Sequence, residues 1–426
     1  MSIHRRNFLK AGSMAAGAAA LGMLSTPRMA HADGGDKLRA VLIGCGGRGR
    51  GAATNFLKVP NTEIVAAADA FENNAKSVMK MFNLTEDQCF WGFDAYRKVL
   101  AVDCDYVILA TPPGFRPIHY KAAVEAGKHV FMEKPCCVDA PGFKMLMEVN
   151  KLVDEKGLKV GVGLQRHHQA GYLQGIKEIA DGKLGDFVFS RVYWNGSGVW
   201  VRPRQEKWTE MEFQMRNWYY FNWLCGDNIC EQHVHNLDVG NWAKTVMSGK
   251  NLFEEYCHPV KCNGMGGREV RKGNPNYGEI FDHHYVEFEY ADGTRMISQC
   301  RHQPRTWNSA SEHVHGTKKV GGENVSGRAK GRDPFEQEHF DLVDAIRNGT
   351  RYHEGYIGAY SSMTAVLGRM ATYSGQVIHW DEAVEKGRAD MIYENHDQLT
   401  MESTPPVKLL KNGQYSVAVP GQWKPW

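Results

Sequence analysis

A glycine-rich loop between an apolar strand and a helix constrains this chain more than any other feature. The run LRAVLI at residues 38–43 has the composition of a buried strand, GCGGRGRG follows it, and AATNFLKV then has a helical pattern. Gly44, Gly46 and Gly49 have the spacing G-x-G-x-x-G, which lets the backbone approach a pyrophosphate at a helix N-terminus. We therefore predict a dinucleotide-binding Rossmann fold, with Gly47 and Arg48 also at the cofactor.

The choice between NAD and NADP depends on the acid that follows the loop. Asp69 closes the second apolar run, TEIVAAADA. A carboxylate at this place accepts hydrogen bonds from a ribose diol and repels a 2′-phosphate, so NAD is preferred. Arg48 and Arg50 keep NADP open, although either can serve the pyrophosphate instead. A helix cap is the alternative role for Asp69.

Strand and helix patterns alternate from the glycine loop onward. CDYVILATPP, HVFMEKP and KVGVGLQ are predicted strands, and PIHYKAAVEAG and DAPGFKMLMEVNKLVDEKG are predicted helices. This alternation is typical of a doubly wound parallel sheet in an α/β protein. We expect the dinucleotide-binding domain to cover residues 37–165.

The pattern changes after Gln165. GDFVFSRVYWN alternates like a half-exposed strand, and FDHHYVEFEYADGTRMISQCRH contains an Asp-Gly hairpin signal. FEQEHFDLVDAIRNG and GAYSSMTAVLGRMATYSG are predicted amphipathic helices. With 426 residues the chain is long enough for two cores. We predict a second domain over residues 166–426, built on an antiparallel sheet.

The N-terminus has the pattern of a twin-arginine (Tat) signal peptide over residues 1–32. SIHRRNFLK carries Arg5 and Arg6, a short Ala/Gly-rich apolar run follows, and Ala30-His31-Ala32 forms a cleavage site. The run is too weakly apolar for a good membrane anchor, although an uncleaved anchor is the alternative. We therefore expect export by the Tat machinery, to the periplasm or otherwise out of the cytoplasm, without stable membrane insertion after cleavage.

Composition excludes some classes of function. Lys and Arg total 51 against 48 Asp and Glu, a net charge of +3, which does not indicate nucleic-acid binding. The ten cysteines form no C-x-x-C pair, so neither a zinc ribbon nor a redox dithiol is indicated. Bridges between Cys225 and Cys230 and between Cys257 and Cys262 are the alternative to free thiols.

One segment of the chain carries the signature of a known protein family. It is ATPPGFRPIHYKAAVEAGKHVFMEKP, which ends in the triplet Glu133-Lys134-Pro135. Together with GLQRHHQAGY, EQHVHNLD and HWDEA, it resembles the glucose–fructose oxidoreductase / inositol dehydrogenase / rhizopine-catabolism (Gfo/Idh/MocA) family. The resemblance implies a Rossmann domain followed by an α/β domain with an open, mostly antiparallel sheet. Since this sheet often serves in oligomer contacts, a homo-oligomer is expected.

The resemblance also implies catalytic residues. Lys134 would contact the nicotinamide ribose and the substrate hydroxyl and stabilise a developing alkoxide. His235 would be the general base, because its ordinary pKa lies near working pH. Glu231, four residues earlier, replaces the family's commoner Asp and is expected on the same helical face, where it can orient His235. Asp227 is a rival for the acid role.

Further residues follow from the same resemblance. Thr111, Pro112, His119 and Glu133 are expected at the cofactor, with Gln165 near the nicotinamide. The predicted substrate residues are Arg166, His167, Tyr172, Asp227 and His233. The aromatic stretches WNGSGVWVRPR and RNWYYFNW are candidates for stacking on a sugar or for a structural role. A metal site at histidines 233, 235, 283 and 284 is an alternative, because His-x-His and His-His clusters bind transition metals. These histidines give no ligand set with a clear geometry, so no metal is predicted.

An exported dehydrogenase cannot readily exchange NADH, because NAD pools are cytoplasmic. We therefore expect an NAD(P)-dependent oxidoreductase that keeps its cofactor tightly bound and acts on a secondary hydroxyl of a sugar or glycoside. The alternative is a redox-neutral, NAD-dependent glycosidase that works through a transient 3-keto sugar and elimination. A non-catalytic cofactor-binding protein is the second alternative.

Overall fold

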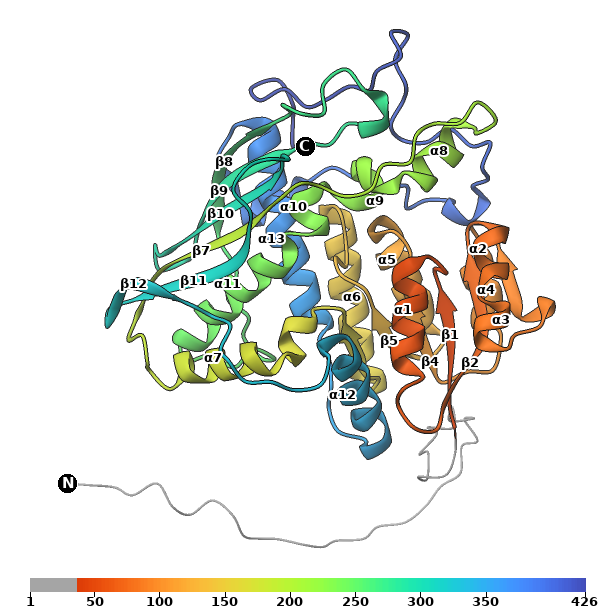
Figure 1. Cartoon of the computed structure of the whole chain (residues 1–426), viewed down its shortest axis with the longest axis horizontal. Helices are drawn as coiled ribbons and strands as arrows, with labels where there is room; N and C mark the ends of the chain where they lie inside the picture. The colour runs from red at the N-terminus through yellow and green to blue at the C-terminus, as the bar shows by residue number, and fades with distance from the viewer. Residues whose placement is uncertain (1–36) are drawn as a thin grey trace, which may run out of the picture. The chain divides into compact units, whose positions relative to one another are not determined.

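The computed structural model describes residues 37–426, so the predicted signal peptide lies outside the described residues. Its first sheet has six parallel strands in the order β3-β2-β1-β4-β5-β6 (Figure 1). The strands are β1 (Leu38–Ile43), β2 (Thr62–Asp69), β3 (Cys89–Trp91), β4 (Tyr106–Leu109), β5 (His129–Met132) and β6 (Val160–Val162). This is the predicted doubly wound sheet.

Helices cover both faces of this sheet. They are α1 (Gly47–Phe56), α2 (Glu72–Ser77), α3 (Met79–Phe82), α4 (Ala95–Leu100), α5 (Arg116–Glu125) and α6 (Ala140–Lys156). Successive residues of β1 point to opposite faces, so Leu42 packs in one hydrophobic cluster and Ile43 in the other. The covered parallel strands are therefore nearly continuously apolar.

The second sheet has seven strands in the order β12-β11-β7-β10-β9-β8-β13 (Figure 1). All neighbours are antiparallel except β7 and β10, which run parallel. The predicted Asp-Gly hairpin joins β9 to β10. The strands are β7 (Phe187–Gly196), β8 (Lys261–Gly267), β9 (His283–Glu289), β10 (Arg295–His302), β11 (Ser309–Gly316), β12 (Lys319–Asn324) and β13 (Ile378–His379).

The helices of the second half are α7 (Ala170–Ala180), α8 (Glu210–Arg216), α9 (Asn222–Cys225), α10 (Asn228–Glu231), α11 (Val234–Met247), α12 (Pro334–Asn348), α13 (Gly355–Ser374) and α14 (Trp380–Lys386). Helix α13 was expected to be amphipathic but is buried almost all round, because it packs against α6, α11 and strand β8. Helix α12 places Leu342 and Val343 in the same cluster as Phe56 of α1. Among residues 37–426, no helix has the length and apolar character needed to span a membrane.

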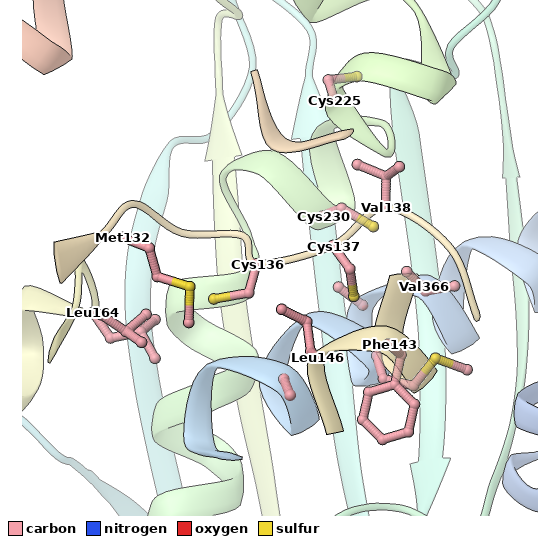
Figure 2. Packing of buried hydrophobic residues seen from close by; sticks show 14 of the residues in the cluster. Met132, Cys136, Cys137, Val138, Phe143, Leu146, Leu164, Cys225, Cys230 and Val366 are labelled. Atoms are coloured by element: carbon pink, nitrogen blue, oxygen red, sulfur yellow. The ribbon is translucent and has the colours of Figure 1, made fainter. Parts of the chain in front are cut away.

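All ten cysteines lie among the described residues as free thiols, so neither considered disulfide is formed. Cys136, Cys137, Cys225 and Cys230 pack among Met132, Val138, Phe143, Leu146, Leu164 and Val366 (Figure 2). Burial raises the pKa of the Cys136 and Cys230 thiols to about 12. These thiols are therefore protonated and serve as small apolar side chains in the core.

Candidate dinucleotide cleft and active site

The carboxyl ends of β1, β2 and β4 border a cavity of about 460 Å³. Open α/β sheets bind their ligands at this edge. Eight of the residues predicted at the cofactor line the cavity: Gly44, Gly46, Gly47, Arg48, Asp69, Thr111, Pro112 and His119.

The glycine loop closes tightly on itself and opens toward the cavity. Gly44 has φ of +100°, and a Cβ on Gly49 would lie 1.8 Å from the carbonyl oxygen of Gly44. A Cβ on Gly46 or Gly47, in contrast, would meet no heavy atom within 4 Å. Helix α1 begins at Gly47 without a side-chain cap, which leaves its first N–H groups for an anion.

Asp69 does not serve as the helix cap considered as an alternative, because α2 begins after Phe71 without a side-chain cap. The Asp69 carboxylate accepts hydrogen bonds from the backbone N–H of Cys45 (2.8 Å) and of Phe71 (2.9 Å), and from Asn74 Nδ2 (3.1 Å). Burial raises the pKa of Asp69, while these hydrogen bonds act in the opposite direction. The carboxylate thus orders the turn after β2 and also lines the cavity.

Arg48 connects the glycine loop to two buried acids. Its guanidinium forms ion pairs with Glu133, and with Glu338 of α12 at 2.9 Å. Burial, together with the neighbouring charge of Glu133, raises the pKa of Glu338 well above its ordinary value. Because the Arg48 guanidinium is already paired with two carboxylates of the protein, it is a weaker partner for the 2′-phosphate of NADP.

His119 supports the cavity wall at Thr111. The Thr111 hydroxyl lies 3.2 Å from His119 Nδ1, and the imidazole stacks on Tyr96 with ring centroids 4.5 Å apart. Burial lowers the pKa of His119 well below its ordinary value, so the ring is neutral.

Lys134 follows β5 and reaches a helix end from the second half of the chain. Its ammonium donates to the backbone carbonyl of Glu231 and, at 3.2 Å, to Glu231 Oε1. Both side chains are largely shielded, with 15% and 14% exposed. The structure therefore brings these two predicted catalytic residues into direct contact.

The expectation that Glu231 and His235 share one helical face is wrong. Helix α10 ends at Glu231 and α11 begins at Val234. The N–H of His233 donates to the carbonyl of Asn228, five residues back, which widens the turn and interrupts the helix. Glu231 pairs with Lys134 instead.

His235 is buried near this pair and lacks a partner on one nitrogen. Only 7% of the residue is exposed, and among the described residues nothing hydrogen-bonds its Nδ1. Burial, and then the positive charge of Lys134, lowers the pKa of His235 well below its ordinary value. The ring is therefore neutral at neutral pH, which is the state that accepts a proton. Trp194 of β7 lies beside it, with ring centroids 6.3 Å apart.

Three of the predicted substrate residues lie in buried hydrogen-bond networks. They are Arg166, Tyr172 and His167. Arg166 and Tyr172 both bind the carboxylate of Glu312, at 2.5 and 2.8 Å. His167 contacts Asp238 at 2.6 Å and stacks on a tryptophan. Their part in substrate binding stays a prediction.

Two other predicted residues point into the core. Asp227 is fully buried, lies 3.4 Å from His284 Nε2, and accepts from Tyr373 OH (2.6 Å) and the backbone N–H of Phe281 (2.9 Å). These neighbours, His284 first, lower its pKa to about 2 against the effect of burial. His233 is also fully buried and contacts Ser298 of β10 at 2.8 Å. Both side chains are enclosed away from Lys134, which leaves Glu231 as the acid beside it.

Several cavity residues were not expected there. Trp200 and Trp218, from the aromatic stretches considered for sugar stacking, line the dinucleotide cavity instead. Arg202 and Arg216 come from the same two stretches, whereas no sequence signal singled out others such as Phe71, Asn74 and Met215. Within residues 37–426, no three His, Cys, Asp or Glu side chains gather in a way that would hold a metal ion.

Comparison with known proteins agrees with this geometry. Residues 38–164 match the oxidoreductase family with an NAD-binding Rossmann fold, and residues 2–22 match the twin-arginine translocation signal sequence. An NADP-dependent scyllo-inositol 2-dehydrogenase of Bacillus subtilis is 33% identical over 41% of this chain and 48% of its own length. An inositol 2-dehydrogenase of Rhizobium meliloti is 28% identical over 78% of this chain and 88% of its own.

A glycosyl hydrolase family 109 protein of Streptomyces coelicolor is 23% identical over 61% of this chain and 54% of its own. The matches to the first curated relatives span only about half of those proteins' lengths.

The fold has solved counterparts. The scyllo-inositol dehydrogenase of Lactobacillus casei, solved with NAD(H) and scyllo-inositol, superposes with a TM-score of 0.62 at 17% identity, covering 81% of this chain and all of its own. The N-terminal signal sequence addresses the chain to export through the Tat pathway. Residues 38–164 of the chain thus match the Gfo/Idh/MocA oxidoreductase family, with its NAD-binding Rossmann fold, and residues 2–22 before them match a Tat signal sequence.

Proposed function

We propose that the protein is an exported, NAD-dependent oxidoreductase that acts on a secondary hydroxyl of a sugar or polyol. The observation that carries the proposal is the contact of Lys134 with Glu231, next to a neutral, buried His235, at the edge of the sheet where the glycine loop lies. These side chains are of the types that alcohol oxidation requires.

The residues present fit a dinucleotide. Gly46 and Gly47 leave open space over the uncapped start of α1, and Asp69 lines the same cavity. The Oε1 atom of Gln165, just after β6, is buried and has no hydrogen-bond partner among the described residues. It would suit the carboxamide of the nicotinamide. When bound, the dinucleotide supplies the hydride acceptor.

The protein's own side chains would handle the proton and the charge. The neutral imidazole of His235 accepts the hydroxyl proton, and the ammonium of Lys134 stabilises the negative charge that develops on the oxygen. Glu231 holds Lys134 in place through both its carbonyl and its carboxylate.

Export supports a retained cofactor. The Tat pathway is associated with folded cargo, so a dinucleotide can be loaded in the cytoplasm and carried along. Mass spectrometry of the denatured, purified protein should therefore release NAD(H) close to one per chain. Incubation with a panel of inositols and aldoses should give a keto or lactone product. A protein that neither contains nor binds a dinucleotide would overturn the proposal.

A redox-neutral glycosidase is the second candidate. It is favoured by the similarity to the Streptomyces coelicolor hydrolase and by export, which makes a redox cycle closed on one substrate useful. Aryl glycosides distinguish the two. Release of the aglycone without net NADH supports the hydrolase, whereas a keto-sugar product without aglycone release supports the oxidoreductase.

A further inference from the structure

The cavity at the carboxyl edge of the parallel sheet is roofed by a distant part of the chain. Trp200, Arg202, Met215, Arg216 and Trp218 line it together with residues of the first 120 positions, such as Asp69. The rings of Trp200 and Trp218 meet edge to face, with centroids 5.8 Å apart. Because Asp69 marks the expected place of the adenosine ribose, this roof lies over the adenosine end of the cleft.

The roof is held in place by hydrogen bonds within the protein. The N–H of Arg202 donates to Asn217 Oδ1 at 2.9 Å, and Asn217 in turn donates to the carbonyl of Asn276 at 2.7 Å. Arg204 donates to Asn276 Oδ1 through its backbone and to Tyr415 OH through its guanidinium, at 3.0 and 2.7 Å. All these partners belong to the second half of the chain, so the roof is preassembled.

One contact reaches across to the dinucleotide-binding half. The Arg216 guanidinium lies 4.1 Å from the ring centroid of Phe71, two residues after Asp69. Glu212, one turn earlier on α8, accepts from Arg216 Nε at 2.8 Å and fixes its direction. This cation–π contact joins the roof to the turn that follows β2.

The chemistry of the lining suits a dinucleotide. Arg50, Arg202 and Arg216 line the cavity, and among its lining residues Asp69 is the one carboxylate. The Arg202 guanidinium stacks on Trp200 at 5.2 Å and forms no ion pair within the described part of the chain. Indole rings stack on nucleobases, and unpaired guanidinium groups bind phosphates.

We propose that residues 200–218 form a cofactor clamp over the adenosine end, fastened by Arg216 on Phe71, and that this clamp sets the rate at which the dinucleotide leaves. The inference rests on the proposed dinucleotide-dependent function. It identifies which residues keep the cofactor in an exported protein that cannot replace it.

The dissociation rate tests the clamp. The mature protein, purified with its dinucleotide, is incubated with charcoal to trap released cofactor, and the dinucleotide left on the protein is measured over time after denaturation. Trp200→Ala and Trp218→Ala should each release it about tenfold faster, since base stacking on an aromatic ring contributes on the order of 1–3 kcal/mol, and 1.4 kcal/mol is tenfold. Arg216→Ala should also release it several-fold faster, because it removes the cation–π contact that fastens the clamp to Phe71. Trp307→Ala is the matched control, because Trp307 is 60% exposed, packs on Tyr193 and lies outside the cavity lining.

The outcomes separate the two proposals. If the wild-type protein binds no dinucleotide even when NAD is added, both the proposed function and the clamp are refuted. If the wild type retains its dinucleotide but all three variants release it at a rate within twofold of the wild-type rate, the clamp is refuted and the proposed function stands. Trp200 is 43% exposed, so Trp200→Ala is expected to fold. This variant still tests the clamp if Arg216→Ala does not fold.

Proteolysis gives a second readout that does not depend on activity. The irregular segment before α8 offers trypsin the bonds after Arg204 and Lys207, and Lys207 is exposed. Bound dinucleotide should slow cleavage there several-fold relative to protein stripped on charcoal. Equal cleavage rates with and without dinucleotide would contradict the clamp.

Discussion

Replacing His235 by Asn tests both its neutral state and its role as base. Burial and the positive charge of Lys134 lower the pKa of His235 well below its ordinary value, so the folded protein resists protonation of this ring as the pH falls from 7 to 5. The unfolded chain takes up the proton with the ordinary pKa of about 6.5. The unfolded state therefore gains about 2 kcal/mol at pH 5 relative to pH 7, and stability falls on acidification.

His235→Asn should remove this share of the pH dependence. Urea unfolding at pH 7 and pH 5 should give a stability difference about 2 kcal/mol smaller than that of the wild type. The variant should also lose about 10²- to 10⁴-fold in kcat/KM with its dinucleotide still bound.

His339→Asn is the matched control. His339 is fully buried on α12, burial lowers its pKa to about 3, and its Nε2 also lacks a partner among the described residues. It should lose the same acid sensitivity of about 2 kcal/mol but keep its activity, because it contacts Tyr106 rather than the site. Activity within tenfold of wild type in His235→Asn, or equal losses in both variants, would refute the reasoning.

Three further outcomes are expected. Lys134→Met should lower kcat/KM by about 10²-fold or more and should also lower the melting temperature, since it removes the cation beside the largely shielded Glu231 carboxylate. Gly49→Ala should abolish dinucleotide binding in a titration with NAD, because its Cβ would collide with the Gly44 carbonyl at 1.8 Å. The plot of log kcat/KM against pH should stay level as the pH falls from 8 through 6.5, because His235 is neutral throughout this range, whereas a fall centred at 6.5 would indicate an ordinary histidine as base.

Local patterns determined much of this protein. The glycine spacing, the apolar strands and the Asp-Gly hairpin each depend on neighbours a few residues apart, where backbone sterics and side-chain alternation decide the outcome. The sequence by itself therefore predicted the parallel sheet, the mostly antiparallel second sheet and the glycine loop. The Tat signal was predicted in the same way, from residues 1–32, and its family match agrees.

Only the tertiary structure decided which distant groups meet. Arg48 pairs with Glu338, 290 residues later, and Lys134 with Glu231, 97 residues later. The break between α10 and α11 arises from a hydrogen bond between His233 and Asn228 that no periodicity reveals. The sequence did not predict the roof over the cleft either, because aromatic residues in an irregular segment carry no repeating pattern. Such contacts depend on how separate elements pack, and packing is a property of the whole chain rather than of any short stretch.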